Sequence, residues 1–140
     1  MSKVAVVYWS GTGNTEAMAN AVLEGAKAAG ADASLFTASD FDTSSVADYD
    51  ALAFGCPAMG AEVLEESEFE PMFNACESAL NGKKLALFGS YGWGDGEWMR
   101  NWEQTCQDDG AVLACESVIC NEAPDDEAKE ACRNLGAALA

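Results

Sequence analysis

Ser10-Gly11-Thr12-Gly13-Asn14-Thr15 is the stretch of sequence that decides how this chain folds. It follows an apolar run at residues 4–9, whose length and β-branched content predict a buried strand. Beyond it, apolar and small residues recur with the spacing of one helix face, namely Met18, Ala21, Val22, Gly25 and Ala29. The stretch is therefore predicted to be the turn between a buried strand and a helix.

The same turn has the chemistry of a phosphate-binding loop. The first backbone N–H groups of a helix lack partners and carry the positive end of the helix dipole. Glycine lets the backbone approach a ligand closely, and four side chains can hydrogen-bond phosphate oxygens: Ser10, Thr12, Asn14 and Thr15. We predict that the turn binds a phosphate group, and a plain strand-to-helix connector is the alternative.

Two other kinds of phosphate-binding loop match the turn less well. A nucleoside-triphosphatase loop needs the pattern G-x-x-x-x-G-K-[ST], whereas residues 10–15 contain no lysine or arginine. A dinucleotide-binding turn needs a third glycine, and this chain has Glu16-Ala17 after Gly13. Metal-assisted phosphoryl transfer is therefore disfavoured, and the dinucleotide pattern is only partly met.

Length and charge narrow the classes of function. With 140 residues, the chain is predicted to form one domain, residues 1–140, with its own hydrophobic core. No run approaches the ~20 apolar residues of a membrane span, so we expect a cytoplasmic protein. Asp and Glu number 24 against 7 Lys and Arg, which gives a formal net charge of −17. This charge repels nucleic acid and anionic membranes and attracts basic protein partners, with acidity for solubility alone as the alternative.

Cysteine and histidine usage excludes several chemistries. None of the cysteines forms a Cys-x-x-Cys pair, so we predict reduced, mostly buried thiols at Cys56, Cys76, Cys106, Cys115, Cys120 and Cys132. Histidine is absent, which removes His-based catalytic triads and His metal sites. We expect no metal site and no catalytic acid or base.

Strand and helix patterns alternate along the rest of the chain. Further strands are predicted at 32–37, 51–56 and 84–89, and one interrupted strand at 111–120. Helices are predicted from a capping box at Ser67 and Glu70 to Gly82, then at 98–109 and 124–140, with a polar loop at 40–49. The pattern predicts an α/β fold, a doubly wound five-stranded parallel sheet with helices on both faces. Loops that open at Ser10, Pro57 and Ser90 then share the carboxyl edge of the sheet, where ligands bind.

Three stretches closely resemble the flavodoxins, in particular the short-chain type from anaerobic bacteria. They are residues 8–15 (YWSGTGNT), 55–60 (GCPAMG) and 87–94 (LFGSYGWG), in the order and at the spacing of that family. The resemblance covers essentially the whole chain and departs from the pattern at Ala61, where close relatives are expected to carry a polar residue. It implies the strand order 2-1-3-4-5, for which flavodoxin is itself a standard example.

The resemblance also implies non-covalently bound FMN and a role for each loop. Residues Ser10, Gly11, Thr12, Gly13, Asn14 and Thr15, with Ser90, would hold the phosphate. Trp93 and Met59 would cover the two faces of the isoalloxazine, Gly60 would lie beside flavin N5, and Glu62 would accept from N3–H. The cofactor-binding loops would comprise Pro57, Ala58, Met59, Gly60, Ala61 and Glu62, and Ser90, Tyr91, Gly92, Trp93, Gly94 and Asp95.

The function implied is that of a low-potential one-electron carrier, not an enzyme. Its FMN would pass among oxidised, semiquinone and hydroquinone states while redox proteins with basic docking surfaces bind transiently to a monomer. Two alternatives stay open from the residues alone: an FMN-dependent quinone or azo reductase, and a signalling receiver on the same layout. Read singly, Trp93 and Met59 also suit ordinary packing, Gly60 a turn, and Glu62 a solvated acidic face.

Overall fold

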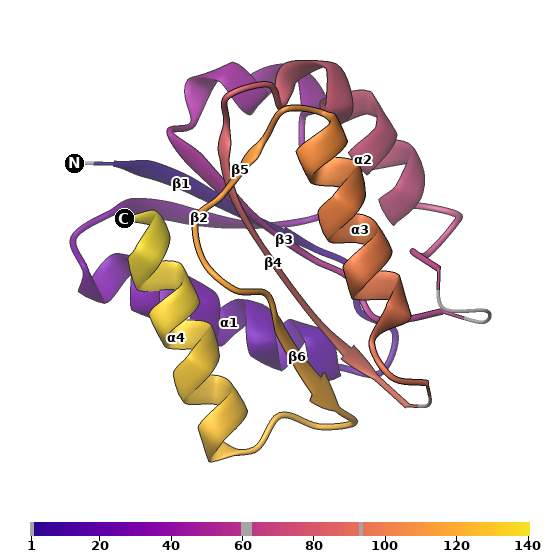
Figure 1. The fold of residues 1–140 in the computed structure, drawn as a ribbon. Coiled ribbons are helices and arrows are strands. Elements are labelled where there is room, and N and C mark those ends of the chain that lie inside the picture. Colours follow the sequence, from indigo (N-terminus) through magenta and orange to yellow (C-terminus); the bar gives the residue numbers. More distant parts are fainter. Residues whose placement is uncertain (1, 60–62, 93) are drawn as a thin grey trace.

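A parallel sheet forms the centre of the protein, whose computed structural model describes residues 2–59, 63–92 and 94–140 (Figure 1). The strands run in the order β2-β1-β3-β4-β5, and β6 also pairs with β4. Their bounds are β1 Lys3–Tyr8, β2 Asp32–Thr37, β3 Ala51–Gly55, β4 Lys84–Tyr91, β5 Val112–Leu113 and β6 Val118–Asn121. The predicted fold class and strand order are confirmed.

The interrupted fifth strand is also confirmed, as two short pieces. β5 pairs with the start of β4 at Lys84 and Leu85, and β6 pairs with its end from Phe88 to Tyr91. Both pieces are parallel to β4 and occupy the same side of it. The predicted end of β4 was two residues short, because pairing with β6 extends this strand through Ser90 and Tyr91.

Two pairs of helices cover the two faces of the sheet (Figure 1). Helices α1 (Asn14–Ala28) and α4 (Asp126–Leu139) lie on one face, and α2 (Phe69–Cys76) and α3 (Glu97–Asp108) on the other. The segment predicted as a loop at 40–49 contains a 3-10 helix, η1 (Thr43–Asp48), and a second one, η2 (Glu77–Ala79), follows α2. The η1 turn forms because Asp42 accepts a hydrogen bond from the Ser44 N–H at 3.0 Å.

Alternate residues of the central strands enter two separate cores. In β1, Val4 and Val6 pack with α1 and α4, while Ala5 and Val7 pack with α2 and α3. All four side chains are fully buried. Burial on both faces explains why this strand reads as one continuous apolar run.

Helices α1 and α4 approach so closely that two glycines form the contact. A Cβ atom at Gly25 would lie 1.9 Å from the carbonyl oxygen of Arg133, and one at Gly136 would lie 2.0 Å from that of Val22. No real Cβ makes contacts this short, so the two backbones touch where these residues have no side chain.

The predicted capping box at the start of α2 is wrong. Ser67 does not cap the helix; its N–H (2.8 Å) and hydroxyl instead donate to the Glu65 carboxylate. The other oxygen of this carboxylate accepts from the N–H groups of Glu68 and Phe69, at 2.8 and 2.9 Å. The Glu65 carboxylate therefore satisfies the N–H of Phe69, the first residue of α2, and those of the two residues before it.

Candidate functional site

Strand register brings three loops together at the carboxyl edge of the sheet. Tyr8 lies opposite Gly55, and Gly55 lies opposite Phe88, so β1, β3 and β4 reach this edge together. The chain continues in step beyond the strands, because Trp9 N–H donates to the Gly55 carbonyl and Ala58 N–H donates to the Ser90 carbonyl, each at 3.0 Å. The three loops predicted to form one site are therefore adjacent.

These loops enclose a cavity of about 310 Å³. Nine of the predicted site residues line it: Gly11, Thr12, Asn14, Pro57, Ala58, Met59, Ser90, Tyr91 and Gly92. Four others, Gly60, Ala61, Glu62 and Trp93, lie outside the residues that the structure describes. The remaining predicted residues, Ser10, Gly13, Thr15, Gly94 and Asp95, do not line the cavity wall.

Backbone conformation at Gly13 shapes the predicted phosphate loop. Gly13 has a φ of 92° at the N-cap of α1, a left-handed conformation that favours glycine, and no atom would obstruct a Cβ there. Its N–H donates to Ser10 Oγ at 3.0 Å, which closes the turn. Ser10 and Gly13 therefore hold the loop in shape, while Gly11, Thr12 and Asn14 face the cavity.

The Trp9 indole occupies the space beside Gly11 that a side chain at this position would need. A Cβ there would lie 3.0 Å from the end of the Trp9 indole. The indole lies against the glycine and lines the cavity. A side chain at position 11 would therefore displace the tryptophan.

Thr15 and Ser90 are both buried and joined by a hydrogen bond between their hydroxyl groups, 3.1 Å long. This bond ties the first turn of α1 to the end of β4. A hydroxyl group donates one hydrogen bond, so the hydroxyl that accepts in this pair keeps its own hydrogen for another acceptor. The pair retains a donor that suits a phosphate oxygen.

The Asp95 side chain forms an ion pair with Arg100. Its carboxylate accepts from Arg100 at 3.0 Å, and both side chains are largely exposed, so the pair contributes little to stability. Asp95, which was predicted to bind the cofactor, is not among the residues that line the cavity, and Arg100, one turn into α3, donates to both its backbone carbonyl and its carboxylate.

Cys56 directly precedes Pro57 of the cavity wall, and its thiol is buried. Burial raises the pKa of Cys56 to about 12, although the Glu65 N–H donates to its sulfur at 3.4 Å. All six cysteines are free, as predicted. A thiol with such a pKa stays protonated near neutral pH, so it supplies no nucleophile beside Pro57.

Met59 and Val63 pair through two backbone hydrogen bonds, of 2.9 and 3.0 Å. The bridge fixes both ends of the connection that carries the predicted residues Gly60, Ala61 and Glu62. Met59 lines the cavity, so the bridge also sets the position of its wall.

Two residues of the cavity wall were missed by the sequence-based prediction, Trp9 and Glu122. Trp9 was assigned to the buried strand, although it ends the apolar run next to the glycine loop. Glu122 follows β6 with a φ of 60°, and its N–H donates to the Tyr91 carbonyl at 2.8 Å. A residue directly after a parallel strand lies at the carboxyl edge of the sheet, so the position of Glu122 could have been predicted. It was missed because the predicted strand ended two residues earlier, at Cys120.

The described residues contain no cluster of three or more Cys, Asp or Glu placed to hold a metal ion. Across the helices within the described ranges, none is both long and apolar enough to cross a membrane. The cavity instead combines neutral hydrogen-bond donors beside α1 with apolar walls from Trp9, Pro57 and Met59. Such a cavity suits a ligand with a phosphate at one end and a flat apolar ring at the other.

Comparisons with known proteins agree with this chemistry. The family model described as Flavodoxin matches residues 6–136. The chain is 50% identical over 137 residues to the flavodoxin of Megasphaera elsdenii, with 98% of each chain covered. It is 46% identical over 135 residues to that of Clostridium beijerinckii, covering 96% of this chain and 97% of the relative. The solution structure of two-electron reduced Megasphaera elsdenii flavodoxin superposes with a TM-score of 0.89 over 97% of each chain, at 50% identity.

Proposed function

Because the chain belongs to the flavodoxin family, we propose that the cavity between the loops at 10–15, 57–59 and 90–92 is its FMN site. Flavodoxins are electron-transfer flavoproteins and not enzymes, so this protein carries electrons between redox partners. When bound, FMN supplies the redox chemistry, and the protein supplies binding, orientation and electrostatics.

The observation that carries the proposed site is the convergence of nine predicted residues on one cavity. The α1 end offers unpaired backbone N–H groups and the neutral side chains of Thr12 and Asn14, which suit a phosphate without a basic residue. Trp9 and Met59 offer apolar surface to the ring system. The residues present therefore fit FMN at both ends of the molecule.

We predict that Thr12→Val weakens FMN binding by about 1–3 kcal/mol, because it removes a hydrogen bond to a charged oxygen and keeps the size of the side chain. Riboflavin, which lacks the phosphate, should bind much more weakly than FMN and lose little more in the variant. Titrating the apoprotein with each flavin by fluorescence quenching measures both affinities. Thr105→Val, at an exposed threonine of α3, is the control and should change neither. Equal losses for the two flavins would show that Thr12 does not contact phosphate.

Acidic residues are proposed to steer basic redox partners to this edge of the sheet. The net charge is −17, and Glu122 lies in the cavity wall itself. Negative charge also favours a low reduction potential, since one charge about 10 Å from the reduced ring opposes an added electron by on the order of 1 kcal/mol. We further propose that residues 1–140 act as one FMN-binding domain, as a monomer in the cytoplasm, where the six free cysteines stay reduced.

The association rate with a basic cytochrome is expected to fall about tenfold or more between 0.01 M and 0.3 M salt. The Debye length shortens from roughly 30 Å to below 10 Å over this range, so long-range steering is lost. Stopped-flow measurements of electron transfer at increasing ionic strength test the prediction, and the dissociation rate should change less. An association rate independent of salt would leave the acidic residues with a solubility role alone.

A further inference from the structure

Tyr8 and Glu16 lie on the two sides of the predicted phosphate loop and are joined by a hydrogen bond. Tyr8 is the last residue of β1, and Glu16 is the third residue of α1. The Tyr8 hydroxyl donates to the Glu16 carboxylate at 3.0 Å. The bond therefore spans the loop at 10–15, to which the proposed function assigns the FMN phosphate.

The loop offers a phosphate the first N–H groups of α1. The first hydrogen bond of the helix runs from the Ala17 N–H to the Gly13 carbonyl, at 3.0 Å. The N–H groups of Asn14, Thr15 and Glu16 precede it, so they have no carbonyl partner within the helix. Gly13, at the N-cap, has no side chain that could accept from them. Together with the positive end of the helix dipole, these groups attract an anion.

Glu16 is itself an anion in the first turn of this helix. From the third helical position, a glutamate side chain commonly turns back to accept from the N–H of the N-cap residue. Here that N–H belongs to Gly13, and it donates to Ser10 Oγ at 3.0 Å. A Glu16 carboxylate in this place would compete with Ser10 and would put a negative charge where the phosphate is proposed to bind.

The Tyr8 hydroxyl holds the Glu16 carboxylate elsewhere. Tyr8 is 7% exposed and packs in the core formed with α1 and α4, so its ring has a fixed position. Burial, and then the hydrogen bond and charge of Glu16, raise the pKa of the Tyr8 hydroxyl, which therefore keeps its proton and stays a donor. Glu16 is exposed, so the bond to Tyr8 rather than burial orients its carboxylate.

We propose that Tyr8 is a positioning residue for phosphate binding, whose hydroxyl holds the Glu16 carboxylate away from the start of α1 and keeps the N–H groups there open to the ligand. This inference rests on the proposed FMN site and adds to it a residue that does not line the cavity. Without the hydroxyl, the carboxylate accepts from the Gly13 N–H and opposes the phosphate. Riboflavin, which has no phosphate, is opposed far less.

Tyr8→Phe removes the hydroxyl and keeps the buried ring, so the fold should persist. It should weaken FMN binding about fivefold or more, and riboflavin binding less, because a negative charge and a lost donor act on the phosphate alone. Dilution of each holoprotein, followed by the fluorescence of released flavin, measures the FMN affinity, and titration with riboflavin measures the other.

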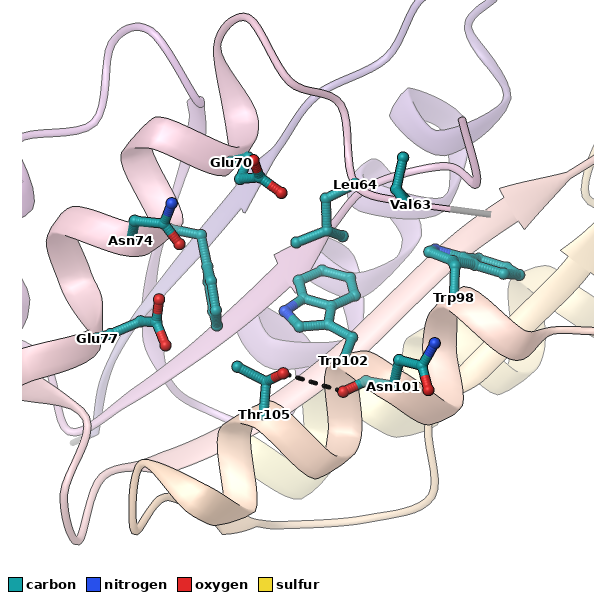
Figure 2. A pocket seen from close by; sticks show the side chains of 10 residues that line it. Val63, Leu64, Glu70, Asn74, Glu77, Trp98, Asn101, Trp102 and Thr105 are labelled. Atoms are coloured by element: carbon teal, nitrogen blue, oxygen red, sulfur yellow. Dashed lines mark hydrogen bonds between the residues drawn. The ribbon is translucent and has the colours of Figure 1, made fainter. Parts of the chain in front are cut away.

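Thr105→Val is a control for the loss of a hydroxyl elsewhere. The Thr105 hydroxyl donates to the Asn101 carbonyl at 3.1 Å, and both residues line a separate cavity between α2 and α3 (Figure 2). No residue lines both this cavity and the proposed FMN site. The substitution should therefore leave both flavin affinities unchanged.

Glu16→Ala supplies the decisive comparison. If Tyr8 acts through Glu16, Glu16→Ala should bind FMN at least as tightly as the unsubstituted protein, and the double variant Tyr8→Phe/Glu16→Ala should match Glu16→Ala. A purely structural role of Tyr8 would leave the full loss in the double variant. That outcome, or a loss in Glu16→Ala equal to the loss in Tyr8→Phe, would overturn the proposal.

Amide NMR of the full chain without flavin separates this proposal from the proposed function. A hydrogen bond to a carboxylate is shorter and stronger than one to a hydroxyl, so the Gly13 amide proton should move downfield in Tyr8→Phe and return in the double variant. An unmoved Gly13 signal would overturn the role of Tyr8. An unsubstituted protein that binds FMN no more tightly than riboflavin would instead contradict the phosphate site itself.

Discussion

Gly136→Ala is expected to destabilise the protein by about 2–4 kcal/mol, although alanine is the better helix former. The new Cβ would lie 2.0 Å from the carbonyl oxygen of Val22 and 2.9 Å from the Ala26 nitrogen. Both are backbone atoms of α1, so relief requires α1 and α4 to separate. Separation would loosen the core that includes Met18, Val22 and Leu135. Urea denaturation measures the change as a lower midpoint with an unchanged slope.

Asn134→Ala is the matched control for this prediction. Asn134 lies on α4 two residues before Gly136 and is exposed, so alanine there meets no backbone. Helix propensity alone should then act and stabilise the protein by up to about 0.5 kcal/mol. If Gly136→Ala is as stable as the unsubstituted protein, the close approach of α1 and α4 described above is incorrect.

Glu65→Ala is expected to cost about 2–4 kcal/mol, because it leaves three backbone N–H groups at the start of α2 without their acceptor. Glu65 is only 5% exposed, so water does not readily replace the carboxylate. The loss should appear in urea denaturation and as faster amide hydrogen exchange at Glu68 and Phe69. Glu66→Ala, at the exposed neighbour, should change stability by less than about 0.5 kcal/mol. Equal effects of the two substitutions would contradict a capping role.

The Glu65 carboxylate also makes the stability of the protein depend on pH. Burial acts to raise the pKa of Glu65, but the hydrogen bonds from Ser67, Phe69 and Glu68 outweigh it and lower the pKa from 4.5 to about 2. A pKa that is lower in the folded state stabilises the protein above pH 4.5, and the contribution is lost as pH falls toward 2. The difference corresponds to about 3 kcal/mol.

Glu65→Gln separates this acid dependence from that of the other carboxylates. Glutamine keeps the shape of the side chain and cannot ionise, so the stability difference from the unsubstituted protein should shrink steadily between pH 5 and pH 2. Denaturation at a series of pH values measures the difference. A difference that stays constant over this range would show that Glu65 is not ionised in its cap.

Much of the fold and part of the site follow from local patterns. The apolar runs at 4–9, 51–56 and 84–89 became strands with bounds shifted by one or two residues, because burial on both faces leaves a clear signal in composition. The less buried run at 32–37 became β2 with the predicted bounds. The left-handed φ of Gly13 and the loops after β1 and β3 were likewise predictable, since turn geometry depends on the residues in the turn. The nine predicted residues in the cavity wall come from these loops and from the end of β4.

Features that depend on which side chains meet in the folded chain escaped prediction, whether the partners are near or distant in sequence. Glu65 displaced the expected capping box because its carboxylate is buried at the start of α2, where several N–H groups converge on it. The ion pair of Asp95 with Arg100 was likewise not predicted. Glu122 entered the wall because β6 pairs with the end of β4, in a register that a four-residue strand does not reveal.

The sequence alone therefore determined the order of strands and helices, the glycine-containing turn after the first strand and the acidic character of the protein. Periodicity, glycine conformation and charge are properties of short segments, and they are read without knowing what packs against them. Only the tertiary structure decided which side chains share the cavity proposed for FMN and where α1 and α4 touch backbone to backbone. Those outcomes depend on strand register and helix packing, which place atoms to within an ångström and are properties of the whole folded chain.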